Sequence, residues 1–227
     1  MRTLVFDTET TGLPKTQIIG PSTMHLWPHV VQFSYIIFDM DSNKIVKIKD
    51  SIIKVPDGFT ISEENAKIHG ITTEMSLAKG VSLQPVLEEF FADLHNVDYI
   101  VGHNISFDLN MVKVELHRLI LQCINVDEVA KFHECITFLN MSNKLYCTMQ
   151  ETIDYCNIEM KDKFGRLYKK FPKLIELYQK MFNVTPKNLH NSLIDVIVCL
   201  RCFVKLKCNV DIVERSTEVK QMIIDYL

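Results

Sequence analysis

The chain has 227 residues, of which 47% are apolar, so it is long and apolar enough for one globular domain with a substantial core. The net charge of -3 excludes a general polyanion-binding protein, although it is compatible with gripping a few nucleotides at a strand end. The sequence has no apolar run long enough to predict a membrane span. It has seven cysteines, an odd number, and no recognisable signal peptide, so we expect an intracellular protein, cytoplasmic or nuclear and not secreted.

The N-terminal half of the chain predicts strands first and helices afterwards. Short apolar or alternating segments indicate strands over residues 3–6, 30–39 and 44–53. These three strands are close in sequence and separated by turn residues, so we expect an antiparallel meander. Helical spacing then predicts helices over residues 62–70 and 83–94.

The C-terminal half alternates strands with helices. A buried strand over residues 99–102 is followed by a longer helix with Leu109, Val112, Leu116 and Leu119 on one stripe. The stretch from 123 to 145 is the hardest to interpret and predicts partial helix or an insertion. A strand is expected at 146–148, and helices at 149–156, 171–182 with Pro172 in its first turn, 192–207 and from about 216. The fold class predicted is α/β, with a mixed sheet flanked by helices.

Three acidic segments lie beside predicted element ends, at residues 7–12 (DTETTG), 103–108 (HNISFD) and 190–195 (HNSLID). Singly, each acid has an ordinary explanation as an exposed charge at a strand end or in the first turn of a helix. Together, Asp7, Glu9, Asp108 and Asp195 would repel one another unless divalent cations lay between them. The sequence therefore predicts a two-metal site that cleaves phosphodiester bonds.

The spacing within these segments adds geometric detail. Asp7 and Glu9 are two apart, so their side chains project from the same face of a strand. His190 precedes Asp195 by five residues, so the two do not share a face of one regular helix, and we place His190 on the loop that enters the helix. A neutral imidazole there could accept a proton from water near neutral pH, whereas without the acids it would be an ordinary surface histidine.

At these residues the chain resembles the DEDDh exonucleases of the DnaQ-like group, which include the epsilon subunit of DNA polymerase III and the TREX enzymes. Residues 64–72 and 171–178 are similar to the same family, and the resemblance covers roughly residues 1–207. It implies an RNase H-like fold, with a mixed five-stranded sheet flanked by helices on both faces. We assign residues 1–210 to a DEDDh exonuclease domain and 211–227 to a C-terminal helical tail.

The resemblance also implies the roles of individual residues. Asp7 would bridge two Mg²⁺ or Mn²⁺ ions, Glu9 and Asp195 would hold the ion that binds the attacking water, and Asp108 would support the other ion. His190 would be the general base. Contacts with the terminal nucleotide are implied for Thr10, Leu13, Glu64, His69 and Asn104.

The implied activity is 3′→5′ removal of nucleoside 5′-monophosphates from single-stranded 3′ ends. DNA is favoured because the first segment is more similar to epsilon than to oligoribonuclease. The alternatives are an RNA exonuclease similar to RNase T or oligoribonuclease, and a proofreading subunit that acts mainly through a polymerase partner. Only about 20 residues follow the helix at 192–207, which favours a free-standing enzyme.

Two further signals are open to more than one interpretation. Residues 161–173 hold six basic residues interleaved with Phe164, Tyr168 and Phe171, which suits either contact with a single strand or a solvated loop. Trp27 lies in the loop between the first two strands and could line the mouth of the site or cover the sheet. Cys199 and Cys202 have CxxC spacing inside an amphipathic helix, where buried thiols are favoured over a zinc site.

Overall fold

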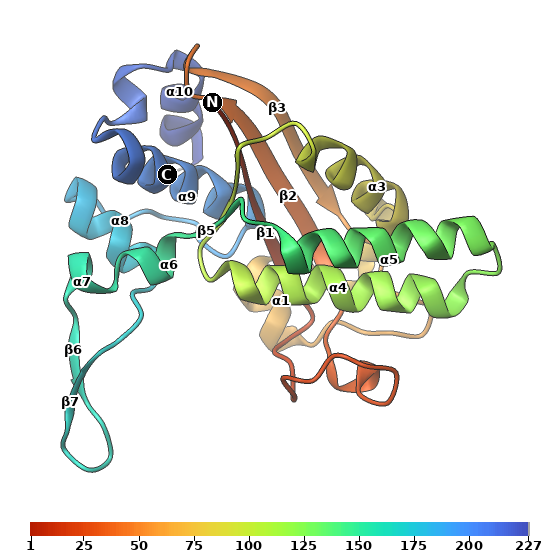
Figure 1. The fold of residues 1–227 in the computed structure, drawn as a ribbon. Coiled ribbons are helices and arrows are strands. Elements are labelled where there is room, and N and C mark those ends of the chain that lie inside the picture. The colour runs from red at the N-terminus through yellow and green to blue at the C-terminus, as the bar shows by residue number, and fades with distance from the viewer. Residues whose placement is uncertain (227) are drawn as a thin grey trace.

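The computed structural model describes residues 1–226, in which a five-stranded mixed sheet lies between helices on its two faces (Figure 1). The strand order in the sheet is β3-β2-β1-β4-β5. The strands are β1 (Arg2–Thr10), β2 (Val30–Asp39), β3 (Lys44–Ile52), β4 (Tyr99–Gly102) and β5 (Leu145–Cys147). The predicted mixed five-stranded sheet is confirmed.

The first three strands form the expected antiparallel meander, but β1 is longer than its apolar run predicts. Its pairing with β2 continues past Phe6, because Asp7 lies opposite Ser34 and Glu9 lies opposite Gln32. The ladder hydrogen bonds satisfy the backbone of this polar segment, so the strand extends to Thr10, beyond the predicted strand at residues 3–6. Both acids therefore lie on regular strand rather than in a loop.

The other two strands run parallel to β1. β4 pairs with β1, and β5 pairs with β4, each in parallel. Parallel strands end at the same edge of a sheet, and the helices that follow them begin there. The C-terminal end of β1 and the segment after β4 are therefore neighbours.

Helices account for most of the remaining chain. They are α1 (Glu63–His69), α2 (Thr73–Lys79), α3 (Leu83–Leu94), α4 (Ile105–Gln122), α5 (Val126–Met141), α6 (Thr148–Glu151), α7 (Ile153–Cys156), α8 (Leu174–Phe182), α9 (Ser192–Cys208) and α10 (Thr217–Tyr226), with short 3₁₀ turns at Met24–Leu26 and Ile212–Glu214. The segment that was hardest to interpret holds α5, which packs antiparallel beside α4 (Figure 1). None of these helices is long and apolar enough to cross a membrane, as far as the described residues extend.

Two predicted helix boundaries were wrong. The helix expected from residue 171 begins at Leu174, because Lys173 keeps an extended backbone and its N–H donates to the Glu176 carboxylate at 2.7 Å. Pro172 therefore lies before the helix rather than in its first turn. The helix expected over 149–156 is two short helices, because Thr152 has a non-helical backbone between them.

Apolar side chains cover both faces of the sheet because side chains of β1 and β2 alternate in direction. Leu4 and Phe6 pack with α3 and α4 on one face, whereas Val5 packs with α9 on the other. Helix α10 contacts α9 and β3, so the segment assigned to a tail packs on the sheet domain. Residue 227, which that assignment included, lies outside the described part, and the domain boundary stays a prediction.

Residues 159–169 form a two-stranded hairpin that projects from the body (Figure 1). Its strands are β6 (Glu159–Lys161) and β7 (Leu167–Lys169), which pair antiparallel and are exposed throughout. From the sequence this basic stretch suited either contact with a single strand or a solvated loop, and no strands were predicted in it. The strands were missed because each has three residues, which is too short to show a period.

Candidate active site

The alternation of β1 places the first two acids on the face covered by α9. Val5 packs against that helix, and Asp7 and Glu9 continue the same side of the strand. The backbone carbonyl of Asp7 accepts a hydrogen bond of 2.6 Å from the Ser192 hydroxyl at the start of α9. This bond fixes the beginning of the helix against the strand that carries both acids.

The start of α9 delivers the next two groups. Asn191 caps the helix by accepting from the N–H of Ile194. His190, just before it, has a left-handed backbone with φ of 69°, which is uncommon for a residue other than glycine. Its N–H donates to the Asp195 carboxylate at 3.3 Å, so the turn holds the acid of the first helical turn and presents an exposed imidazole beside it. The predicted placement of His190 on the entering loop is confirmed.

The fourth acid comes from the other side of the sheet edge. Asn104 also has a left-handed backbone, with φ of 65°, and turns the chain from β4 into α4. Asp108 follows in the first turn and is buried. Its Oδ1 accepts from both the N–H and the hydroxyl of Thr8, at 2.9 and 2.7 Å. Thr8 is the residue between Asp7 and Glu9, so Asp108 lies against the part of β1 that carries both acids.

The acids and the histidine converge on one place. Ligand atoms of Glu9, His190 and Asp195 all lie within 4.8 Å of one another. Repulsion from Asp7 acts on the other three carboxylates, so it lies among them. Within residues 1–226, no lysine or arginine forms a salt bridge with any of the four acids. The cluster is therefore an uncompensated concentration of negative charge.

Burial and mutual repulsion raise the pKa of every acid in the cluster. Burial raises the pKa of Asp7 from 3.8 to about 7, opposed by its contact with Ser192. Burial, followed by repulsion from Asp7, raises the pKa of Glu9 from 4.5 to about 9. The same two causes hold the pKa values of Asp108 and Asp195 well above 3.8. The four carboxylates therefore resist ionising together unless a cation joins them.

The donor set fits hard divalent cations. Asp7 Oδ2 and Asp195 Oδ1 are buried and have no hydrogen-bond partner among residues 1–226, which is costly for a carboxylate oxygen. Oxygen ligands from carboxylates are those that Mg²⁺ and Mn²⁺ prefer. An ion held between these acids would both satisfy the two oxygens and neutralise the repulsion.

The five residues expected to contact substrate are distributed around this cluster in different ways. His69, at the end of α1, is buried near His190, and its Nδ1 accepts from the N–H of Ile71 at 3.1 Å. Its Nε2 makes no regular hydrogen bond within residues 1–226, although the Thr10 backbone lies beside the ring. Thr10 is buried and its hydroxyl donates to the Gly12 carbonyl at 2.7 Å. The remaining three are exposed, and no hydrogen bond in the described part of the chain joins their side chains to the acids: Leu13, Glu64 and Asn104.

Several residues that support the site were not selected from the sequence. Thr8 lies between the two acids of β1 and holds Asp108, a contact that no local pattern reveals. Gln32 on β2 accepts from the N–H of Ser192 at 3.1 Å and donates to Asp50 at 2.8 Å. These residues are far apart in sequence, so only the sheet register brings them together.

Neutral His103 is a further supporting residue. Its Nδ1 lies 2.9 Å from the Thr148 hydroxyl, and its Nε2 lies 2.9 Å from the carbonyl of Pro172. Burial lowers its pKa to about 4. Its position in the second acidic segment was the only available signal, and nothing in that segment indicated which partners it would meet.

The loop between β1 and β2 is held by one partly buried arginine. Arg118 on α4 donates to the carbonyls of Trp27, Pro28 and Met24 at 2.7, 2.9 and 3.1 Å, and to Glu115 at 2.7 Å. Trp27 is 4% exposed, so it belongs to the core and not to the mouth of the site. Leu13 in the same loop is 80% exposed and thus free to meet a ligand.

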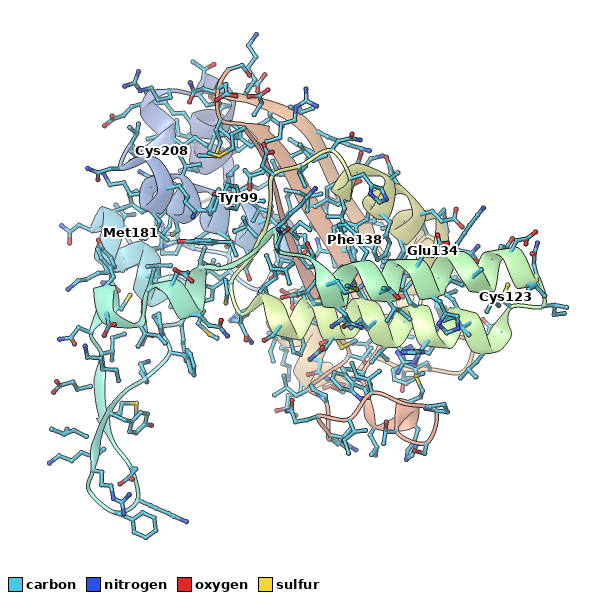
Figure 2. The ribbon with its side chains drawn as sticks, viewed as in Figure 1. Tyr99, Cys123, Glu134, Phe138, Met181 and Cys208 are labelled. Carbon is cyan, nitrogen blue, oxygen red and sulfur yellow. The ribbon has the colours of Figure 1, made fainter. Side chains whose placement is uncertain are left out.

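A cavity of about 470 Å³ lies elsewhere, between α3, α4 and α5. It is lined mainly by apolar residues, among them Leu87, Phe91 and Phe138, and by none of the acids of the cluster. Figure 2 shows Phe138 and Glu134 on this side of the molecule, on α5. The acid cluster therefore does not share this cavity.

The mixed sheet with four acids and a histidine at one edge defines an exonuclease fold. Residues 4–203 match the RNase T family model, which is described as an exonuclease family, so the chain belongs to the RNase T, or DnaQ-like, exonuclease family. The resemblance drawn from the three acidic segments is thereby confirmed.

Individual proteins of known sequence are only distantly similar to this chain. The DNA polymerase III subunit epsilon of Buchnera aphidicola subsp. Acyrthosiphon pisum (strain APS) is 25% identical over 157 residues, which cover 67% of this chain and 59% of that protein. The chain thus spans a little over half the length of this curated relative.

Solved structures share the fold. E. coli exonuclease I in complex with a dT13 oligonucleotide has a TM-score of 0.55 at 18% identity, covering 90% of this chain and 41% of that one. A 3′-exonuclease that recognises the 3′ end of a histone mRNA stem-loop has a TM-score of 0.58 at 10% identity, covering 92% and 83%. The RNase H-like fold expected from the sequence is confirmed.

Proposed function

We propose that this protein is a metal-dependent 3′→5′ exonuclease that releases nucleoside 5′-monophosphates from single-stranded 3′ ends, with DNA favoured over RNA. The observation that carries the proposal is the convergence of four unpaired acids and one histidine, from three distant segments, at a single sheet edge. Membership of an exonuclease family supports the same chemistry.

Asp7, Glu9, Asp108 and Asp195 would hold two divalent cations, Mg²⁺ or Mn²⁺. When bound, such ions supply Lewis acidity that activates water and stabilises the leaving 3′ oxygen. The protein's own contribution is to hold the four carboxylates close together, where bound cations would keep them ionised. Thr8 and the backbone N–H of His190 hold carboxylates of the cluster, and Ser192 holds the Asp7 backbone, through the hydrogen bonds described above.

His190 is the proposed general base. Its imidazole is exposed, next to Glu9 and Asp195, and is carried by a backbone turn that keeps it at the open side of the cluster. An imidazole changes charge near neutral pH, so it can take the proton of the attacking water and pass it to solvent. Losing such a base lowers rates by roughly 10²- to 10⁴-fold.

Substrate contacts are proposed for the residues around the cluster. The unpartnered Nε2 of buried His69 would donate to the terminal nucleotide, and exposed Leu13 would pack beside its base. Glu64 and Asn104 would contact the sugar or phosphate from α1 and from the β4–α4 turn, and Thr10 would contribute through its backbone.

RNA is the second candidate substrate, since one structural neighbour is a 3′-exonuclease that recognises a histone mRNA end. A proofreading subunit with a polymerase partner is the other alternative, because the curated relative is a polymerase subunit. Matched DNA and RNA oligonucleotides distinguish a DNA exonuclease from an RNA exonuclease, since the 2′-hydroxyl is the main difference between the two substrates. Stable co-purification with a polymerase would support the subunit instead of the free-standing enzyme.

The central test is a time course on single-stranded oligonucleotides labelled at the 5′ end, with and without EDTA. We expect a ladder that shortens one nucleotide at a time from the 3′ end, and full inhibition by EDTA. Asp7→Ala and His190→Ala should fold normally and lose the ladder, whereas the matched surface controls Asp57→Ala and His133→Ala should keep it. Wild-type degradation by either site variant would refute the role of that residue.

A further inference from the structure

The β6–β7 hairpin concentrates positive charge in a chain that is negative overall. Residues 159–170 hold five basic side chains and the acids Glu159 and Asp162, a net charge of 5 - 2 = +3 against -3 for the whole chain. Among the described residues, Lys169 pairs with Asp154 and Lys170 with Glu176. The other three basic side chains have no salt bridge: Lys161, Lys163 and Arg166.

An exposed aromatic ring lies between two of these free cations at the tip. Phe164 is 71% exposed, with Lys163 Nζ 5.0 Å and Arg166 Cζ 5.6 Å from its ring centroid. A bare ring flanked by cations is what a single nucleic-acid strand requires, because a base stacks on the ring while the cations meet the phosphates. On the adjoining strands, Met160 and Tyr168 are also about half exposed and pair across the hairpin.

The tip is ordered by its own hydrogen bonds. Asp162 Oδ1 accepts from the N–H groups of Phe164 and Arg166 at 2.8 and 2.9 Å, and Gly165 takes the positive φ of 79° that the turn needs. Asp162 Oδ1 is thereby occupied by the backbone, and among the described residues the Asp162 carboxylate forms no salt bridge. The body leaves the hairpin's side chains uncovered on both sides, as Figure 2 shows. A two-stranded hairpin this short gains little stability by itself, so its exposed apolar and basic groups are better explained by a ligand than by folding.

The root of the hairpin is tied to the acid site. Lys170 N–H donates to the Ile158 carbonyl at 3.0 Å, which closes the base of the hairpin. Just beyond it, the Pro172 carbonyl meets His103, which precedes the turn into the helix that carries Asp108. About six residues separate this root from Phe164, a reach of roughly 20 Å in extended chain, which suits a contact several nucleotides from the strand end.

We propose that the β6–β7 hairpin is an auxiliary binding element for single-stranded nucleic acid, which holds the strand several nucleotides upstream of the 3′ end. This inference rests on the proposed exonuclease function, because that function supplies the strand and its direction. Phe164 stacks on a base, and Lys163 and Arg166 contact the flanking phosphates. The element increases affinity for long strands and is out of reach of very short ones.

The test compares wild-type protein with a triple variant, Lys163→Ala with Phe164→Ala and Arg166→Ala. Binding of fluorescent single strands of about 20 and about four nucleotides is measured by anisotropy in EDTA, so that nothing is cleaved. The matched control, Lys131→Ala with Lys220→Ala and Tyr226→Ala, removes the same charge and one exposed ring from α5 and α10. If the triple variant melts below wild type, Lys163→Gln with Arg166→Gln replaces it.

We expect the triple variant to bind the long strand about tenfold or more weakly, with little change for the short strand and no change in the control. Its slope of log affinity against log salt should fall by about 1.4, as two lost contacts to single-strand phosphates require. Unchanged binding of the long strand, or an equal loss in the control, would overturn the proposal. Wild-type binding to phosphatidylserine vesicles that oligonucleotide does not compete away would overturn it in favour of a membrane surface.

Degradation in Mg²⁺ keeps the two proposals apart. If the hairpin binds as inferred, the triple variant degrades the short strand at the wild-type rate and the long strand more slowly at low concentration. If the wild-type protein degrades neither strand, the exonuclease assignment fails, while the binding comparison in EDTA still decides whether the hairpin holds a single strand.

Discussion

Asparagine at position 7 should stabilise the metal-free protein, because it removes one charge from an acid cluster that has no cation to neutralise it. Asp7 is held near Glu9, Asp108 and Asp195, and its Oδ2 is buried without a partner. An amide of the same shape has no charge to desolvate, and its Nδ2 can donate to a neighbouring carboxylate. The substitution should therefore relieve repulsion while removing a ligand of the proposed ions.

The magnitude follows from the pKa of Asp7. Burial raises it from 3.8 to about 7, a difference that corresponds to about 4 kcal/mol once both states are ionised. Neighbouring acids share the proton in the folded state, so we expect Asp7→Asn to raise the free energy of unfolding by about 2 kcal/mol, which is half of that difference. For a chain of this size, that raises Tm by roughly 4–8 °C.

The pH dependence has a definite sign. An acid whose folded pKa is raised stabilises the fold fully below pH 3.8 and loses that contribution as pH rises to about 7. The advantage of Asp7→Asn should thus be greatest at pH 8 and should vanish near pH 4. Thermal unfolding by circular dichroism in EDTA at the two pH values measures it, with the exposed Asp57→Asn as a control that should not move.

The effect of Mg²⁺ on the Tm tests whether Asp7 is a metal ligand. Mg²⁺ should raise the Tm of the wild-type protein with increasing concentration, as any ligand of the folded state does, and should raise that of Asp7→Asn much less. If Asp7→Asn melts below wild type in EDTA at pH 8, the acids do not repel one another enough to destabilise the fold. If it keeps the full rise in Tm with Mg²⁺, Asp7 is not a metal ligand.

Three other outcomes are expected. Neutral His103 should stabilise the fold above pH 6.5 and lose that contribution as pH falls to about 4, in opposition to the acids, so the difference in stability between wild type and His103→Gln should change by up to about 3 kcal/mol over this range in urea titrations. Thr8→Val should weaken Mg²⁺ binding by about tenfold or more in calorimetric titrations, since it frees Asp108 from its hydroxyl donor; equal affinity would contradict this. Arg118→Met should cost about 3–5 kcal/mol of unfolding free energy, because buried Glu115 loses its arginine partner and three loop carbonyls each lose a donor; a loss below 1 kcal/mol would count against the reasoning.

The sheet and the family were predictable because their signals are local. The apolar strands and the three acidic segments each fit within six to ten residues, and two-residue spacing suffices to place Asp7 and Glu9 on one face. The turn before α9 was also predictable, because a separation of five positions does not place His190 and Asp195 on one face of a helix. The roles of these residues in catalysis stay predictions.

What could not be predicted depends on contacts between distant segments. The hydrogen bonds from Thr8 to Asp108 and from Ser192 to the Asp7 carbonyl exist only because the register of β1 with β2 and β4 is fixed. The β6–β7 strands are too short to show a pattern, and the extension of β1 to Thr10 is enforced by its partner rather than by its own residues. Trp27 is likewise fixed by distant residues, because its side chain packs in the core and its carbonyl accepts from Arg118 on α4.

The order of the segments along the chain has a consequence for biosynthesis. β1 is synthesised before the turn with His190 and the helix with Asp195, so the carboxylates meet only after that later helix has docked on the sheet. A chain in which α9 has not yet been made presents isolated acids that cannot form the cluster. Newly made molecules therefore acquire the proposed metal site only when β1, α4 and α9 have folded together.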